Sequence, residues 1–148
     1  MTGTFEGVGS LQFTPDNKHA LAFSGVVASG GGTTTADTLM LEFKTESEYL
    51  VASFSWGNTQ TSGTADNIVR IDFNDQAIYG ARFETGNESN HVNPKILPLI
   101  IPPFTTVKCY ADTSADPHDW TWTMAAKVKG AIQQIDLEAV TDGSKWDQ

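Results

Sequence analysis

The chain has 148 residues, of which 39% are hydrophobic, and this length and composition fit one domain with its own core rather than two. Nine basic and eighteen acidic residues give a formal net charge of −9, so nucleic-acid phosphates would be repelled and direct DNA or RNA binding is not expected. The single cysteine, Cys109, cannot form an internal disulfide, which excludes a disulfide-stapled extracellular scaffold.

The chain is expected to divide into an N-terminal segment (1–19), a folded domain (20–130) and a C-terminal extension (131–148). The N-terminal segment shows neither the basic start nor the apolar stretch of a secretion signal. No apolar run approaches the roughly 20 residues that a helix needs to cross a bilayer. We therefore expect a protein made in a cytoplasm, with no membrane association.

Short apolar runs with period two fill the expected domain and are separated by clusters of Gly, Asn, Asp, Ser and Thr, a pattern typical of β-strands. In such strands the apolar side chains share one face, which is expected to be buried. In chain order, the residues predicted to share the apolar face of each run are Leu21 and Phe23; Leu39, Leu41 and Phe43; Leu50, Ala52, Phe54 and Trp56; Val69, Ile71 and Phe73; Ala77, Tyr79, Ala81 and Phe83; Val107, Cys109 and Ala111; and Trp120, Trp122, Met124, Ala126 and Val128. The NDQ segment, residues 74–76, is predicted to be a hairpin turn.

The run LPLIIPPFTTVKCYAD (97–112) is the most apolar in the chain, yet Pro102 and Pro103 interrupt it. Proline has no N–H for a sheet ladder and is confined to edge strands, strand starts and bulges. Pro98 is therefore predicted to lie at a sheet edge or at the start of a strand. Pro102 and Pro103 are predicted to end the strand at an extended corner where the chain changes sheet, after which Phe104 re-enters the core.

About eight regularly spaced strands indicate an all-β sandwich or barrel, and no internal helix is predicted. The C-terminal run AIQQIDLEAV is ambiguous. Ile132, Ile135, Ala139 and Val140 fit a helical stripe, whereas Ile135, Leu137 and Ala139 fit a strand. The strand is preferred.

The order of these elements resembles the single jelly-roll β-sandwiches found among capsid, vertex and capsid-decorating (cement) proteins of bacteriophages and other icosahedral viruses. The resemblance covers roughly residues 21–130: a Gly- and Thr-rich loop, LMLEFKTESEYLVASFSWG, a hairpin, LIIPPFTTVKCYAD, and a last strand ending in KVKG. It implies an all-β, single jelly-roll β-sandwich of about eight antiparallel strands. Tumour-necrosis-factor-like trimers, carbohydrate-binding modules and cupins share this architecture, so the fold alone does not determine the function.

The function that the resemblance implies is that of a structural virion protein, a minor capsid or capsid-decoration protein. Its partners would be further copies of itself, as a homotrimer or a pentamer, and the major capsid protein. It would be made in the host cytoplasm and would lie on the capsid exterior. The chain is short for a major shell protein and lacks a basic arm to neutralise a packaged genome, which favours the outer position.

No residue pattern indicates an enzyme or a cofactor. Asp112, Asp116, His118 and Asp119 are close in sequence, and their carboxylates could bind Ca²⁺. The spacing matches no known calcium loop, and Asp and Pro are ordinary turn formers, so a solvated loop is preferred and no metal site is predicted.

The other polar motifs also fall short of a catalytic or ligand site. His19, His91 and His118 are expected on separate loops, without the spacing of metal ligands. The SGGGTTT segment lacks the Gly-Lys-Ser/Thr ending of a phosphate loop and is predicted to be a flexible connector. No serine lies in a G-x-S-x-G elbow, and no histidine can be paired with Cys109.

Two pairs of carboxylates could be imagined as glycosidase acids, Glu46 with Glu48 and Asp136 with Glu138. Charged side chains at such positions usually stay exposed to solvent. Both pairs are therefore expected on the solvated surface.

Trp56, Trp120 and Trp122 are in phase with apolar neighbours and are assigned to the core. Exposed tryptophans would instead stack on sugars, so the alternative function is a jelly-roll carbohydrate-binding or host-receptor-binding module. Apolar residues of the C-terminal extension would lie outside a completed sandwich. The residues expected on a neighbouring subunit are Ile132, Ile135, Leu137, Val140 and Trp146.

Overall fold

The computed structural model describes residues 11–30, 32, 35–58, 66–84, 95–114 and 118–129, which form strands and no helix. The strands are β1 (Gln12–Phe13), β2 (His19–Phe23), β3 (Val27–Ala28), β4 (Thr38–Lys44), β5 (Tyr49–Asn58), β6 (Asp66–Phe73), β7 (Gln76–Glu84), β8 (Lys95–Ile101), β9 (Thr106–Thr113) and β10 (Asp119–Lys129). Every pairing between them is antiparallel. The all-β prediction is therefore confirmed for this part of the chain. Within the same residues, no helix could cross a membrane.

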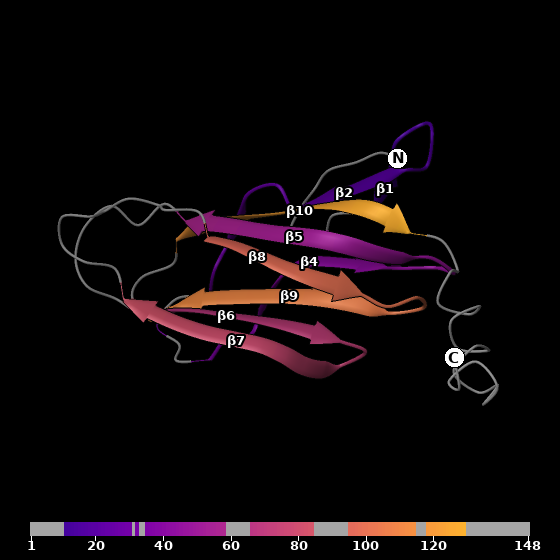
Figure 1. Cartoon of the computed structure of the whole chain (residues 1–148). Coiled ribbons are helices and arrows are strands. Elements are labelled where there is room, and N and C mark those ends of the chain that lie inside the picture. Colours follow the sequence, from indigo (N-terminus) through magenta and orange to yellow (C-terminus); the bar gives the residue numbers. More distant parts are fainter. Residues whose placement is uncertain are drawn as a thin grey trace, which may run out of the picture.

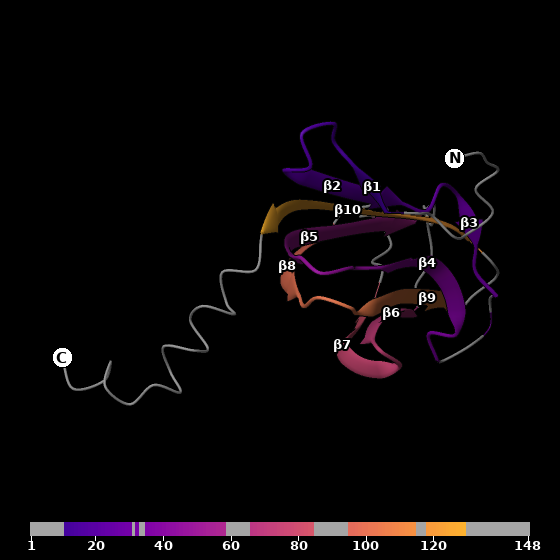
Figure 2. The same cartoon turned by 90° about the vertical axis from the view of Figure 1, so that its right-hand side faces the viewer.

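The strands form two sheets packed as a sandwich (Figure 1). Sheet A has the order β1-β2-β10-β5-β8, and β3 also pairs with β10. Sheet B has the order β4-β9-β6-β7. Figure 2, viewed almost along the strands, separates the two layers: β2, β10, β5 and β8 follow one side, and β4, β9, β6 and β7 the other. The short β1 lies within the expected N-terminal segment and pairs with β2.

The core lies between the sheets and contains most of the residues that period two predicted. Trp56 and Trp122 stack with their ring centroids 4.8 Å apart, and Phe43 of sheet B stacks on Phe54 of sheet A at 6.4 Å. The predicted residues that are buried are Leu41, Phe43, Leu50, Ala52, Phe54, Trp56, Val69, Ile71, Val107, Cys109, Ala111, Trp120, Trp122, Met124 and Ala126. Phe73, Tyr79, Ala81 and Val128 pack against this core and are partly buried.

Three predictions of strand orientation were wrong. In β4, a register shift between Leu39 and Leu41 adds an unpaired residue, so Met40 is fully buried and Leu39 is only partly buried. In β2, the small residues Ala20 and Ala22 face the core, whereas Leu21 is 40% exposed and Phe23 lies on the same outward side. The register explains this: Ala22 pairs with Met124, whose side chain is buried, and paired residues share a face. In β7, Ala77 is exposed; the side chain of Phe83 lies outside the described residues.

The proline corner forms where it was predicted, but Phe104 does not enter the core. Pro98 lies in β8, the edge strand of sheet A, and the chain crosses to sheet B between Ile101 and Thr106. Phe104 follows the two prolines with a φ of 54° and is 65% exposed. The positive φ turns the chain back toward sheet B within one residue, which directs the Phe104 side chain outward.

The β6–β7 hairpin turn is confirmed. Asn74 and Asp75 occupy its two central positions with φ of 52° and 64°. Positive φ at both positions is the geometry of a tight turn that matches the twist of the paired strands. The Asn74 side-chain oxygen also accepts a hydrogen bond from the backbone N–H of Thr106, at 2.8 Å.

Candidate functional site: two interaction surfaces

The outer face of sheet A is a continuous surface assembled from four strands that are distant in sequence. Strand register aligns its side chains in three rows of four. We call this surface the sheet A face; its rows are Phe23, Thr123, Ser55 and Ile96; Leu21, Ala125, Ser53 and Pro98; and His19, Lys127, Val51 and Ile100.

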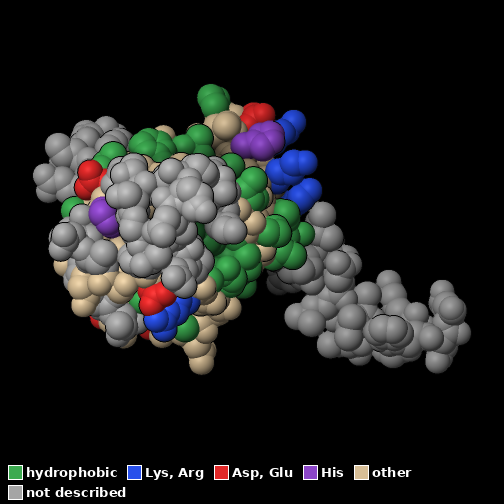
Figure 3. All heavy atoms as spheres, turned by 90° about the vertical axis from the view of Figure 1, so that its left-hand side faces the viewer, with side chains coloured by type: hydrophobic (Ala, Val, Ile, Leu, Met, Phe, Trp, Pro, Cys, Tyr) green, Lys and Arg blue, Asp and Glu red, His purple; other side chains and the backbone are tan. Residues whose placement is uncertain are grey.

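The three rows of the sheet A face carry no carboxylate, although the whole chain has a net charge of −9; on the same side of β10, Asp119 lies beyond one end of the face and Lys129 beyond the other. The one formal charge in these rows is Lys127, next to His19 at one end. Ile96 and Ile100 are 74% and 64% exposed, which is unusual for isoleucine in a strand. Figure 3 shows lysine and histidine side chains beside hydrophobic ones along the upper right of the molecule, with acidic side chains only near the tip of this region.

Side-chain size differs across the strands of this face. The large side chains lie on the two outer strands, Leu21 and Phe23 on β2 and Ile96 on β8. The two middle strands carry short side chains: Ser53 and Ser55 on β5 and Thr123 and Ala125 on β10. We call this strip of short side chains the trough. It ends at the row that contains Lys127 and Val51.

The outer face of sheet B is, in contrast, charged and internally paired. Arg70 donates to both carboxylate oxygens of Asp72 at 2.9 and 3.3 Å, and its guanidinium lies 4.3 Å from the centre of the Tyr110 ring. Lys108 donates to Asp75 at 3.1 Å, and this bond raises the pKa of the lysine.

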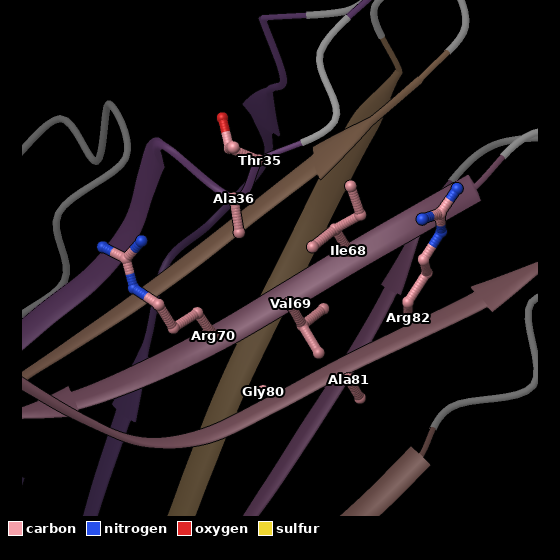
Figure 4. A pocket seen from close by; sticks show the side chains of 8 residues that line it. All are labelled: Thr35, Ala36, Ile68, Val69, Arg70, Gly80, Ala81 and Arg82. Carbon is pink, nitrogen blue, oxygen red and sulfur yellow. The ribbon is translucent and has the colours of Figure 1, made fainter.

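A shallow hollow of about 420 Å³ lies on sheet B between Arg70 and Arg82 (Figure 4). Its floor includes Gly80, whose missing side chain leaves the space open. Both arginines already have carboxylate partners, since Arg82 donates to Asp66 and thereby lowers the pKa of that carboxyl group. The hollow is therefore a poor site for an anionic ligand.

The turn between β8 and β9 is the second exposed apolar feature. The backbone N–H of Phe104 donates to the carbonyl of Glu46 at 2.8 Å, which joins this turn to the one between β4 and β5. Thr45 and Thr105 also connect the two turns. The Thr45 hydroxyl accepts a hydrogen bond from the Thr105 N–H at 2.9 Å and donates one to the Pro102 carbonyl at 2.7 Å. Both threonines are buried. Phe104 is thus an exposed aromatic side chain on a fixed backbone.

Asp112, the first residue of the proposed calcium-loop alternative, has a structural role. It is fully buried, and its carboxylate accepts hydrogen bonds from the backbone N–H groups of Gly30 at 3.0 Å, Asp37 at 2.5 Å and Thr38 at 2.9 Å. The Thr38 hydroxyl donates to it as well, at 2.6 Å. These bonds hold both ends of the Gly- and Thr-rich connector, whose residues 31, 33 and 34 lie outside the described part of the chain.

The remaining polar candidates are not brought together. His19 begins β2 rather than lying on a loop, and His118 lies just before β10. Glu46 and Glu48 are exposed. Cys109 is buried, and this burial raises the pKa of its thiol well above the ordinary value. Among the described residues, no cluster of three or more His, Cys, Asp or Glu side chains could hold a metal ion.

The three tryptophans of the described residues are core residues, as predicted. Trp56, Trp120 and Trp122 are buried, and no hydrogen-bond partner of their indole N–H groups is found in the described part of the chain. They offer no ring for a sugar to stack on. The residues expected on a neighbouring subunit, Ile132, Ile135, Leu137, Val140 and Trp146, lie outside the described residues, as do His91, Asp116, Asp136 and Glu138.

Sequence reasoning missed both surfaces described above. One feature of the sequence could have indicated the sheet A face. The outward positions of two strand runs carry no charge: they are Ser53 and Ser55 in one run and Thr123 and Ala125 in the other. No protein-family model matches this chain, and no curated protein does. Its function therefore has to be inferred from its fold and surfaces.

Proposed function

We propose that this protein is a structural virion protein with a single jelly-roll fold, a minor capsid or capsid-decoration (cement) protein. It associates with itself, as a trimer or a pentamer, and binds the major capsid protein on the exterior of the shell. It acts by covering surface rather than by catalysis.

Strand order supports the jelly-roll assignment. Without the short β1 and β3, eight strands remain among the described residues. In chain order β2 is the first, β4 the second, β5 the third, β6 the fourth, β7 the fifth, β8 the sixth, β9 the seventh and β10 the eighth. Sheet A then has the order first, eighth, third, sixth, and sheet B the order second, seventh, fourth, fifth. This interleaving is what two Greek keys produce when they are wrapped into one double-sheet sandwich.

The single observation that carries the functional proposal is the contrast between the two outer faces of the sandwich. A sheet face exposed to water is expected to carry polar and charged side chains, as the outer face of sheet B does. The sheet A face presents Leu21, Val51, Ile96 and Ile100 without a carboxylate. Exposed apolar side chains gathered on one sheet face are typical of protein interaction sites.

The physical requirements of attachment can be met by a sandwich of this size. A stable contact covers about 800 Å² on each partner, which needs a sheet face together with neighbouring turns. The acidic remainder of the surface would keep unattached copies apart in solution. The paired charges of sheet B would remain solvated on the exposed side of the assembled particle.

The test is co-expression with the major capsid protein encoded by a neighbouring reading frame, followed by purification of the assembled shells. We expect the protein to sediment with the shells at a fixed copy number and to be reached by antibody on intact particles. A matched pair of variants tests whether assembly uses the sheet A face: Ile100→Lys on this face should weaken incorporation, and Ile78→Lys on β7 should not. Shells that never retain the wild-type protein, or that enclose it, would contradict the proposal.

A further inference from the structure

We propose that the turn carrying Phe104 in one copy packs into the trough on the sheet A face of the next copy, so that identical copies join head to tail in a closed ring. This inference rests on the self-association in the proposed function and names the two surfaces that meet. The occupant of the trough is thus a second copy of this chain.

Phe104 has the properties of an anchor residue. A phenylalanine at a φ of 54° is an outlier, and such a conformation persists only where the surrounding structure holds it. Here the backbone of Phe104 is held by its own hydrogen bond to Glu46 and by the neighbouring hydrogen bond between Thr45 and Thr105. A side chain on a backbone that is already held in place loses less entropy on binding, and aromatic anchors dominate the energetics of many interfaces.

The trough has side chains of complementary size. It consists of short side chains, among them Ser53, Ser55 and Ala125, and the outer strands β2 and β8 lie roughly 14 Å apart at about 4.8 Å per strand spacing. This width admits an aromatic ring between Leu21 on one side and Ile96 on the other. The ring would cover side chains that are otherwise 40% and 74% exposed.

The charges on the two surfaces also match. The segment beside Phe104 contains Lys44, Glu46 and Glu48, so it is net acidic, and all three side chains are exposed. The trough ends at Lys127, and the sheet A face carries no carboxylate of its own. When the ring of Phe104 enters the trough, Glu46 of that copy can pair with Lys127 of the next one. Two sheet A faces packed on each other would gain no such pairing.

The placement of the two surfaces sets the symmetry. The Phe104 turn lies at the end of the sandwich where β8 leads into β9, and the trough lies on the outer face of sheet A (Figure 1). A contact between two different surfaces of identical copies is heterologous, and it produces a ring when the rotation closes. A trimer or a pentamer satisfies this condition. A two-fold dimer would require that each copy insert its Phe104 into the trough of the other at the same time.

Disulfide trapping tests the contact directly. The double variant Phe104→Cys/Ser53→Cys should form intermolecular disulfides under mild oxidation and end at one closed species of trimer or pentamer mass. Phe104→Cys alone should give at most a dimer, and Phe104→Cys/Val26→Cys is the matched control, because Val26 is also exposed but lies outside the trough. Native Cys109 is buried with a raised pKa and need not be removed. A double variant that stays uncrosslinked at a concentration at which that variant is still oligomeric overturns the inference.

A second measurement separates this inference from the proposed function. Phe104→Ser should raise the dissociation constant of the oligomer roughly 30-fold, as expected for an aromatic hot spot, with no loss of folded structure. Val26→Ser should leave it unchanged. If Phe104→Ser keeps the oligomer intact, the ring contact is wrong while self-association stands. If the wild-type protein is monomeric and absent from shells, the proposed function fails.

Discussion

Thr38 donates both its backbone N–H, at 2.9 Å, and its hydroxyl, at 2.6 Å, to the carboxylate of Asp112, which lies 74 residues further along the chain. Gly30 and Asp37 complete the set of donors. One buried carboxylate thus joins both ends of the Gly- and Thr-rich connector to β9. The connector is the link between sheet A and the first strand of sheet B, so this contact fixes where the chain changes layer.

Replacement of Asp112 by alanine should destabilise the fold by about 3 kcal/mol or more, because it leaves several partly buried N–H groups without an acceptor. Asp112→Asn should cost less, since the amide keeps one acceptor oxygen. Urea unfolding, monitored by tryptophan fluorescence, measures the free energy of unfolding of both variants. The control is Asp75→Asn, which removes the charge of an exposed ion pair, keeps a residue that tolerates positive φ and should change the free energy of unfolding by less than about 1 kcal/mol. A cost for Asp112→Ala no larger than that for Asp75→Asn would contradict the assigned role.

The β6–β7 turn offers a stabilising substitution. Asp75 has a φ of 64°, a conformation that costs any residue with a side chain and costs glycine nothing. Asp75→Gly should therefore raise the free energy of unfolding by up to about 1 kcal/mol, less the small contribution of the exposed pair with Lys108. Asn74→Gly should gain less, because it also loses the hydrogen bond to Thr106. A lower midpoint of thermal unfolding for Asp75→Gly would show that the turn geometry is different.

Cys109 should behave as an inert core residue. Burial raises the pKa of its thiol well above the ordinary value of 9.0, so the native protein should resist alkylation by iodoacetamide at pH 8. Because the pKa of the thiol is raised in the folded state, Cys109 does not lower the free energy of unfolding while the pH is below the unfolded pKa. The free energy of unfolding should fall as the pH rises above about 9. Mass spectrometry after timed alkylation measures the reactivity. A native-state rate equal to that in urea would show that Cys109 is accessible.

Period two predicted the strands well because each long strand buries one face and leaves the other in water. It fails where local geometry breaks the alternation. The extra residue in β4 brings Met40 into the core, and a bulge of this kind leaves no mark in hydrophobicity alone. In β2 both faces carry apolar residues, and the assumption that the larger ones point inward put Leu21 in the core.

The sheet A face and the exposed Phe104 turn could not be derived from sequence because they depend on contacts between segments that are distant in sequence. The sheet A face combines residues from β2, β5, β8 and β10, and only the strand order places Ser53 between Ala125 and Pro98. Phe104 follows an apolar run and two prolines, which suggested a return to the core. Phe104 instead points outward because its φ is positive. The hydrogen bond between the buried Thr45 and Thr105, which lie 60 residues apart in two different turns, supports this conformation.

If this sandwich works by joining copies of itself, its mass in solution should exceed that of one chain. Size-exclusion chromatography with light scattering should give the mass of a trimer or a pentamer for the full chain. Deletion of residues 131–148, which carry Ile132, Ile135, Leu137, Val140 and Trp146, should weaken that oligomer. A chain of 148 residues that stays monomeric at every concentration, and is indifferent to the deletion, would contradict self-association.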